Sequence, residues 1–302
     1  MTALRGRRLA VYIGLCAVWG STWLVIKIGL RDLPPLTFAG IRMGVACLLL
    51  VPFALTARWN LSRREVLFVP IAGFLQIGLS YALLFIATQW IASGLAAILF
   101  ASFPIWVALF AHFLLPDEPL TGKAVAAAAL GLAGVGLIEA PALVGLFSSP
   151  AAHVAAGGSL VLGSAVVSAY ANVLNKKSLA GVPPVFNVWG QTLVGSAFLL
   201  LGARILEKDA PVRWTPSALG ALAYLAIFGT ALTFAGLFWL IPKVPVAVIG
   251  TIPLVDTLVA VFLGNLILQE TLSLRILVGG AMILAGVVLA VRGRRSPGLA
   301  AP

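Results

Sequence analysis

Residues 27–35 read KIGLRDLPP, and residues 176–184 read KKSLAGVPP. A lysine followed by a short loop and a double proline therefore occurs twice, 149 positions apart. The same shift takes Pro104 to Pro253. Matches at a fixed spacing are the signature of an internal repeat.

Further matches follow at a shift of 152. Glu118 then meets Glu270, and the residues LAGV at 132–135 meet an identical LAGV at 284–287. One three-residue insertion reconciles the two shifts. Because these matches stay in register along the chain, we predict two copies of one structural unit.

The composition places this unit in a membrane. Hydrophobic residues make up 61% of the 302, charged residues only 10%, and the mean hydropathy is +1.10; soluble domains average about 25% charged residues. Apolar stretches of about 20 residues, each long enough to cross a bilayer, recur along the chain. In lipid such stretches must be helical. The predicted spans are 9–29, 36–56, 66–90, 92–115, 122–140, 154–177, 185–205, 216–240, 244–268 and 272–292.

The predicted fold is an all-α membrane protein of ten transmembrane helices. The first repeat covers residues 9–140 and the second covers 154–292. Because five helices is an odd number, the second copy enters the membrane upside down. Inverted repeats are a common construction of secondary transporters. The alternative is a duplicated membrane scaffold without transport activity.

Basic residues indicate the orientation. The net charge is +11, and with the N-terminus inside, thirteen basic residues fall on internal positions and six on external ones. This bias follows the positive-inside rule, so the charge indicates contact with lipid headgroups and not with nucleic acid. We expect a multi-pass protein of a bacterial inner membrane with both termini cytoplasmic. Cys16 and Cys47 lie in apolar helices and are expected to be free thiols.

Several local motifs carry a family resemblance. Residues 17–22 read AVWGST, 101–104 read ASFP and 250–253 read GTIP. In the order and spacing of these motifs, the chain resembles the drug/metabolite transporter superfamily, EamA type. Within that superfamily it resembles exporters of amino acids and metabolites, including aromatic amino acid exporters. The resemblance implies alternating access, efflux of a small-molecule substrate, and a central cavity lined by helices 1, 3, 4, 6, 8 and 9. It also implies a monomer, although the residues themselves are equally compatible with a homodimer. No cofactor or metal site is expected.

Two ionisable residues lie within predicted helices. Asp256, near the midplane of helix 9, could bind a substrate ammonium or couple transport to protons; alternatively it is a buried side chain bonded to Thr257. Arg42, about six residues into helix 2, could bind a substrate carboxylate. A structural role for Arg42, snorkelling or pairing with a carbonyl or an acidic side chain, is the preferred interpretation. Its repeat partner is the uncharged Gln191.

Polar residues mark faces of two helices. Helix 6 carries Ser164, Ser168, Asn172 and Asn175 on one face, and helix 3 carries Gln76 and Ser80 with Tyr81 beside them. Interhelical hydrogen bonding and cavity lining are equally compatible with these stripes. With the deeper aromatic residues and the helix 4 motif added, the candidate cavity residues are Trp19, Gln76, Ser80, Tyr81, Ser102, Trp106, Ser168, Tyr170, Asn172 and Asp256.

Proline and glycine suggest bending and close packing. Pro104 and Pro253 favour kinks that could act in gating or be static. Small-residue surfaces in helices 5 and 10 predict close helix packing; their glycines are Gly131, Gly134, Gly136, Gly279, Gly280 and Gly286.

The leading hypothesis is a secondary exporter of amino acids, neutral and aromatic ones included. A second is an exporter of drugs or organic cations, with Asp256 as the counter-charge. A third is a membrane acyltransferase, based on the spacing of His112 and Asp117; two fixed positions are weak support for it. We do not expect an enzyme.

Overall fold

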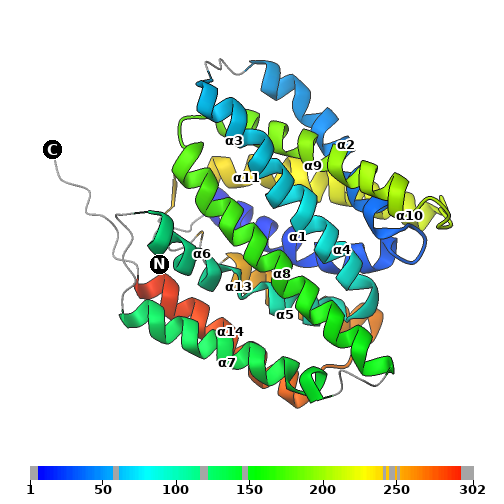
Figure 1. Cartoon of the computed structure of the whole chain (residues 1–302), viewed down its shortest axis with the longest axis vertical. Helices are drawn as coiled ribbons and strands as arrows, with labels where there is room; N and C mark the ends of the chain where they lie inside the picture. Colours follow the sequence, from blue (N-terminus) through cyan, green and yellow to red (C-terminus); the bar gives the residue numbers. More distant parts are fainter. Residues whose placement is uncertain are drawn as a thin grey trace.

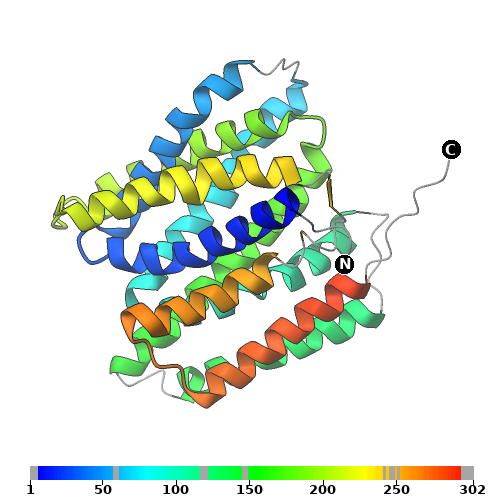
Figure 2. The ribbon, with the colours of Figure 1, turned by 180° about the vertical axis from the view of Figure 1, so that it is seen from behind.

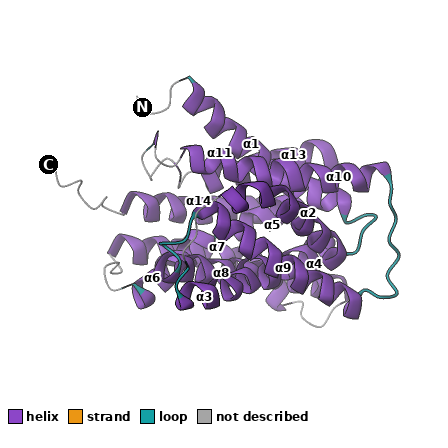
Figure 3. Ribbon diagram, turned by 90° about the horizontal axis from the view of Figure 1, so that it is seen from above, coloured by secondary structure: helices purple, strands orange, loops and turns teal. Residues whose placement is uncertain are grey.

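The computed structural model describes residues 6–56, 61–115, 122–144, 149–240, 243–244, 249 and 252–293. All regular structure within these residues is helical, which confirms the all-α class. The helices run alongside one another (Figures 1 and 3). The elements are α1 (Arg7–Gly29), α2 (Pro35–Thr56), α3 (Arg63–Gly73), η1 (Phe74–Leu79), α4 (Ser80–Trp90), α5 (Ser93–Phe100), α6 (Phe103–Leu114), α7 (Gly122–Val144), α8 (Ser149–Ser178), α9 (Pro184–Leu206), α10 (Pro216–Ala226), η2 (Ile227–Leu232), α11 (Thr233–Leu240), α13 (Ile252–Leu268) and α14 (Leu274–Gly293).

Six helical stretches are long and apolar enough to cross a membrane: Arg7–Gly29, Pro35–Thr56, Arg63–Trp90, Ser93–Leu114, Ala152–Ser178 and Pro184–Leu206. Shorter apolar helices cover Val125–Ile138, Pro216–Leu232, Ile252–Leu268 and Leu274–Leu289. Large apolar side chains also face outward. Leu48 is 71% exposed, and Phe53 and Phe262 are each 63% exposed. An outer surface of this kind suits contact with lipid chains, not with water.

Helix starts follow the local sequence. Ser62 accepts a hydrogen bond from the N–H of Glu65, whose carboxylate accepts one from the N–H of Ser62, so α3 begins with a capping box. Thr215 caps α10 by accepting from the N–H of Ala218 at 3.1 Å. Pro216 stands in the first turn of α10, where its missing N–H costs nothing.

Three predicted spans differ from regular α-helices. The helix expected at 66–90 contains the π-helical segment η1, and the helix expected at 216–240 contains η2. The helix expected at 92–115 is divided into α5 and α6 by a turn at Ala101–Ser102. The sequence did not reveal the π-helical segments, because a single wide turn leaves the apolar pattern nearly unchanged.

Proline explains the division of the fourth span. Pro104 is the second residue of α6, so it starts a new helix instead of kinking a continuous one. Pro253 is likewise the second residue of α13. Helix α13 is described from Ile252 onward, and the motif residues 250 and 251 lie outside the described residues.

Helices from the two predicted repeats pack against each other. Helix α7 lies along α14 at one edge of the molecule (Figures 1 and 2), and α2 packs along α9. Helix α1 packs on α13 and α10, while α8 packs on α6 and α4. Figure 2 shows that α1 begins and α14 ends on the same side of the bundle. The first, third, fourth, sixth, eighth and ninth spans therefore form the middle of the molecule.

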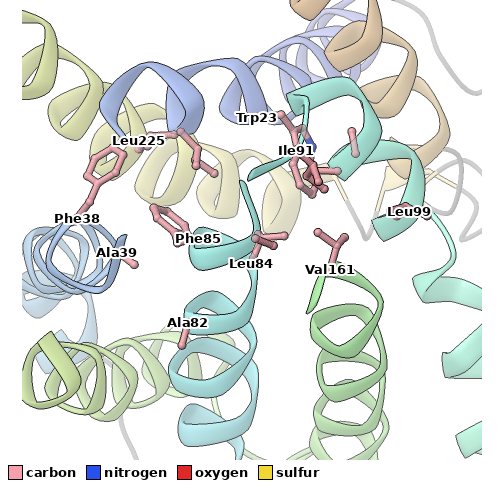
Figure 4. Packing of buried hydrophobic residues seen from close by; sticks show 14 of the residues in the cluster. Trp23, Phe38, Ala39, Ala82, Leu84, Phe85, Ile91, Leu99, Val161 and Leu225 are labelled. Carbon is pink, nitrogen blue, oxygen red and sulfur yellow. The ribbon is translucent and has the colours of Figure 1, made fainter. Parts of the chain in front are cut away.

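The largest apolar cluster joins both halves of the chain. Phe38 of α2 meets Phe85 of α4 edge-to-face at 5.5 Å, with Leu225 of α10 beside them (Figure 4). All three side chains are fully buried. In lipid, packing of this kind and not exclusion of water holds helices together.

Glycines allow the closest helix contact. A Cβ on Gly134 of α7 would lie 2.5 Å from the carbonyl oxygen of Gly279 of α14, and one on Gly279 would lie 2.7 Å from that of Gly134. The predicted small-residue surfaces thus face each other within the chain. Gly136 is different, since a Cβ there would meet nothing within 4 Å.

Candidate functional site

The predicted polar faces of the third and sixth spans come together in the middle of the bundle. The hydroxyl of Ser80 lies 2.8 Å from that of Ser164 and 2.7 Å from that of Ser168, and the Ser164 hydroxyl also donates to the Ser80 carbonyl at 2.8 Å. The amide of Gln76, in η1, donates to Ser168 at 3.4 Å, while its Oε1 is buried without a partner. The serine hydroxyls thus link α4 to α8, and among the described residues the Oε1 of Gln76 has no hydrogen-bond donor.

Arg42 lies on α2, facing the helices of the middle. It is only 3% exposed, and its guanidinium carbon lies 5.5 Å from the ring centre of Tyr81, which stacks on Phe85. Its Nε is buried without a hydrogen-bond partner. Among the described residues, the guanidinium therefore has an aromatic neighbour and no carbonyl or acidic hydrogen-bond partner.

A second polar cluster, which the sequence analysis did not assemble, surrounds Gln191. Its amide nitrogen donates to the Oδ1 of Asn175 at 2.9 Å and to the Oδ1 of Asn187 at 2.8 Å, and Asn187 donates to Asn175 at 3.1 Å. The spacing of Asn187 and Gln191 by four residues was a signal that the two share a helix face. Their connection to Asn175 of α8 depends on how the helices pack.

The break in the fourth span positions two candidate residues. Ser102 is fully buried and donates to the carbonyl of Leu99 at 2.7 Å. The indole nitrogen of Trp106 donates to the Ser102 hydroxyl at 3.2 Å. Ser102 thereby satisfies a carbonyl at the end of α5 and holds the aromatic ring at the start of α6.

Asp256 is the fifth residue of α13 and is partly exposed. The hydroxyl of Thr257 lies 3.4 Å from its carboxylate, but that hydroxyl makes its shorter bond, 2.7 Å, to the carbonyl of Pro253. Close to Asp256, α1 approaches α13 at Gly20, where an added Cβ would lie 2.7 Å from the Asp256 carbonyl oxygen. The glycine of the AVWGST motif thus allows these two helices to meet.

Three further aromatic and polar candidates are Trp19, Tyr170 and Asn172. Trp19 is partly buried, 6.5 Å from the ring of Phe234. Tyr170 is 38% exposed, with its ring 5.5 Å from that of Phe110. Asn172 is exposed, unlike the serines on the same face of α8.

Charged side chains close one end of the bundle. Glu207, just after α9, accepts from the N–H groups of Leu36 and Thr37 at 2.7 and 2.8 Å, and so caps α2. Glu270 accepts from the N–H and the hydroxyl of Ser93, each at 2.8 Å, and so caps α5. Carboxylates are favourable at helix starts because the N–H groups there lack partners. These two caps, which the sequence analysis missed, join the second half of the chain to the first.

Lys27 belongs to the same end. Its ammonium donates to the carbonyls of Thr88 at 2.6 Å and Ile91 at 2.7 Å, at the end of α4. Lys27 therefore caps the C-terminal end of a neighbouring helix. A hollow of about 430 Å³ opens beside Lys27 and Glu270, and another of about 460 Å³ lies over the loops near Asp32 and Arg213. The predicted cavity residues line neither of these two hollows.

Of the candidate catalytic pair His112 and Asp117, the structure describes only His112. His112 lies near the end of α6, with its ring 5.1 Å from that of Phe113. Asp117 and Glu118 lie outside the described residues. The geometry of the His112–Asp117 motif therefore adds no support for an acyltransferase.

Comparison with known proteins places this architecture among transporters. A sequence profile of the EamA-like transporter family matches residues 8–140 and 155–292. The chain is 28% identical over 281 residues to "Uncharacterized transporter YoaV" of Bacillus subtilis (strain 168), covering 92% of this chain and 94% of that one. It is also 28% identical over 296 residues to "Uncharacterized inner membrane transporter YedA" of Escherichia coli (strain K12), covering 96% and 91%.

One relative carries a substrate in its name. "Probable amino-acid metabolite efflux pump" of Salmonella typhimurium (strain LT2) is 29% identical over 294 residues, covering 92% of each chain. A crystal structure with a TM-score of 0.62 and 19% identity covers 95% of this chain and 98% of its own, and it supports the fold alone. Because the two profile matches together cover most of the 302 residues, the chain belongs to the EamA-like transporter family.

Proposed function

We propose that this protein is a secondary transporter that exports small metabolites, amino acids foremost, by alternating access through the middle of the bundle. Family membership supports transport of a small molecule across a bacterial inner membrane. The relative named as an amino-acid metabolite efflux pump supports the choice of substrate. Neutral and aromatic amino acids are the first substrates to test.

The proposed architecture is ten membrane helices in two inverted repeats, residues 9–140 and 154–292, with both termini cytoplasmic. The observation that carries the proposal is the pairing of helices. Equivalent helices meet each other, α2 with α9 and α7 with α14, and the contacts of α1 with α13 and α10 are repeated by α8 with α6 and α4. Two halves related in this way can exchange conformations, which is the basis of alternating access.

The proposed cycle uses the caps at the end of the bundle that holds Lys27. Glu207 and Glu270 join the halves there, so these hydrogen bonds hold the halves together at this face while they persist. Under the proposed orientation this is the external face. Release of the substrate outward requires these caps to separate, and the interruption before Pro104 gives the fourth span a place to bend.

Transport can be tested with purified protein in proteoliposomes. Vesicles loaded with an unlabelled amino acid should take up the same labelled amino acid by exchange, faster than empty vesicles do. The panel should include leucine, phenylalanine, threonine and cysteine. No exchange above empty vesicles across the panel would refute the amino-acid proposal and leave transport of another small molecule.

Asp256 favours a second candidate, the export of organic cations. Within the described part of the chain its carboxylate has one hydrogen-bond partner, Thr257 at 3.4 Å, and no cationic partner. A transported ammonium could supply the missing charge. Under this proposal D256N abolishes cation transport and spares neutral substrates, whereas D209N, at an exposed loop carboxylate, changes neither. Persistence of cation transport in D256N would assign Asp256 a structural role.

A further inference from the structure

Arg42 is a buried charge without a counter-charge. It is the eighth residue of α2, roughly 10 Å along the helix from its start, and is 3% exposed. Among the described residues, no hydrogen bond or ion pair reaches its guanidinium, and its Nε is buried without a partner. Charged side chains inside a membrane face protein or a cavity and pair with something, because an unpaired charge there is costly.

The surroundings of Arg42 come from both halves of the chain. The ring of Tyr81, on α4, lies 5.5 Å away. Gly229 in η2 is also close, since an added Cβ there would lie 3.4 Å from the Nη2 of Arg42 and 3.2 Å from the methyl carbon of Thr22 on α1. The guanidinium therefore lies where α1, α2, α4 and η2 meet, in the part of the bundle that alternating access would rearrange.

The repeat partner of Arg42 shows what a structural polar residue has at this position. Gln191 donates to the side-chain oxygens of Asn175 and Asn187, at 2.9 and 2.8 Å. The 149-residue shift that takes Arg42 to Gln191 takes Ile26 to Asn175 and Phe38 to Asn187. Both acceptors are thus replaced by apolar side chains in the first half. Yet the residue there, Arg42, is charged, whereas Gln191 is not.

The acidic side chains of the described chain do not fill this gap. Glu207, which reaches α2 from α9, uses both carboxylate oxygens on Leu36 and Thr37. Glu270 uses both of its oxygens on Ser93 and Gly94. The acceptor for Arg42 must therefore come from outside these groups.

We propose that Arg42 binds the carboxylate group of the transported solute. A guanidinium can donate two parallel N–H bonds to a carboxylate, and buried apolar side chains such as Phe38, one turn earlier on the same face of α2, strengthen that attraction by excluding water. Tyr81 holds one face of the guanidinium and orients it. The inference rests on the proposed transport function and narrows its substrate to carboxylate-bearing metabolites; solutes whose only charge is positive are excluded from this site.

Wild-type protein alone tests the chemistry. In detergent, its melting temperature should be measured with four compounds of one series: phenylalanine, phenylalaninamide, phenethylamine and 3-phenylpropionate, and then with the corresponding leucine and alanine series. We expect stabilisation by the two carboxylates of at least one series and none by its amide or amine. An amide or amine that stabilises as well as its acid, or no carboxylate effect in any series, overturns the proposal.

Matched variants place the carboxylate at Arg42. R42Q installs the residue of the other repeat and should weaken carboxylate binding roughly 30-fold or more, since a buried charge pair is lost. R42K should retain part of the binding, because it keeps the charge and loses the two-pronged geometry. The control R204Q makes the same change at an exposed arginine near the end of α9 and should bind like wild type. Wild-type affinity in a folded R42Q would overturn the proposal.

Flux measurements separate this inference from the proposed function. Arg42-dependent carboxylate binding without any amino-acid exchange in vesicles would refute amino-acid export and keep the site. Amino-acid exchange that is unchanged in R42Q would keep export and refute the site.

Discussion

Glu207, one residue past α9, accepts hydrogen bonds from both the backbone N–H and the hydroxyl of Thr37 near the start of α2, each at 2.8 Å. The two residues are 170 positions apart and belong to different halves of the chain. A carboxylate at this position satisfies N–H groups that α2 itself leaves without partners, and it also joins α2 to the helix that packs along it.

We expect E207Q to destabilise the protein by about 1–2 kcal/mol, because a charge-assisted cap becomes a neutral one. The melting temperature in detergent should fall accordingly. K208Q, at the adjacent exposed residue, serves as the control and should melt like wild type. Equal melting temperatures for E207Q and wild type would show that the cap contributes nothing to stability.

The cap of α5, in which Glu270 accepts hydrogen bonds from Ser93 and its neighbour, can be divided into its separate hydrogen bonds. S93A removes one hydroxyl but leaves the backbone N–H of Ser93 and Gly94 bonded to the carboxylate, so it should cost about 1 kcal/mol. E270A removes the acceptor of all three bonds and should cost more, about 2–3 kcal/mol. Thermal melting of the two variants checks the order, and a larger loss in S93A would contradict the capping role of Glu270.

The contact between α7 and α14 depends on Gly134. G134A places a methyl group 2.5 Å from the carbonyl oxygen of Gly279, so the helices must separate, at a cost of about 1–3 kcal/mol. G136A, two residues away, has open space and should be neutral or slightly stabilising. Only G134A should therefore lower the melting temperature. Similar behaviour of both variants would argue against close packing at Gly134.

The serine cluster between α4 and α8 should respond to S80A. This change removes the hydroxyl that lies within 2.8 Å of both Ser164 and Ser168, and it should cost about 1–2 kcal/mol. S196A is the control, because the Ser196 hydroxyl donates only to a carbonyl of its own helix. Thermal melting checks the difference, and an S80A loss no larger than that of S196A would show that the cluster does not hold the helices together.

Much of the architecture was accessible from the sequence. The lengths of the apolar stretches predicted where most helices lie, and the repeat predicted which segments correspond, because both depend on patterns along the chain. The polar faces of the third and sixth spans were also visible, since residues three or four apart share a helix face. Whether Ser80 would face Ser164 or an open cavity was not, because this depends on the rotation of two helices about their axes.

The site shows the same division. The sequence marked Arg42 as an ionisable residue in the membrane, but it could not show that the Nε of Arg42 has no hydrogen-bond partner among the described residues. The caps formed by Glu207 and Glu270 were missed because their N–H partners lie 170 residues or more away in the chain. The π-helical segments were missed because they change backbone hydrogen bonding without changing the apolar pattern.

The sequence by itself determined that this protein is helical and that it belongs in a bilayer, and it predicted that its two halves correspond. These properties follow from hydrophobicity and repetition, which each segment carries on its own. The tertiary structure decided which polar groups satisfy one another. Gln191 has two amide oxygens as hydrogen-bond acceptors. Arg42, at the matching position of the other half, has apolar neighbours and an aromatic ring instead. The physical reason is that a buried polar group is satisfied by whatever neighbouring helices bring to it, and this is fixed only when the helices pack.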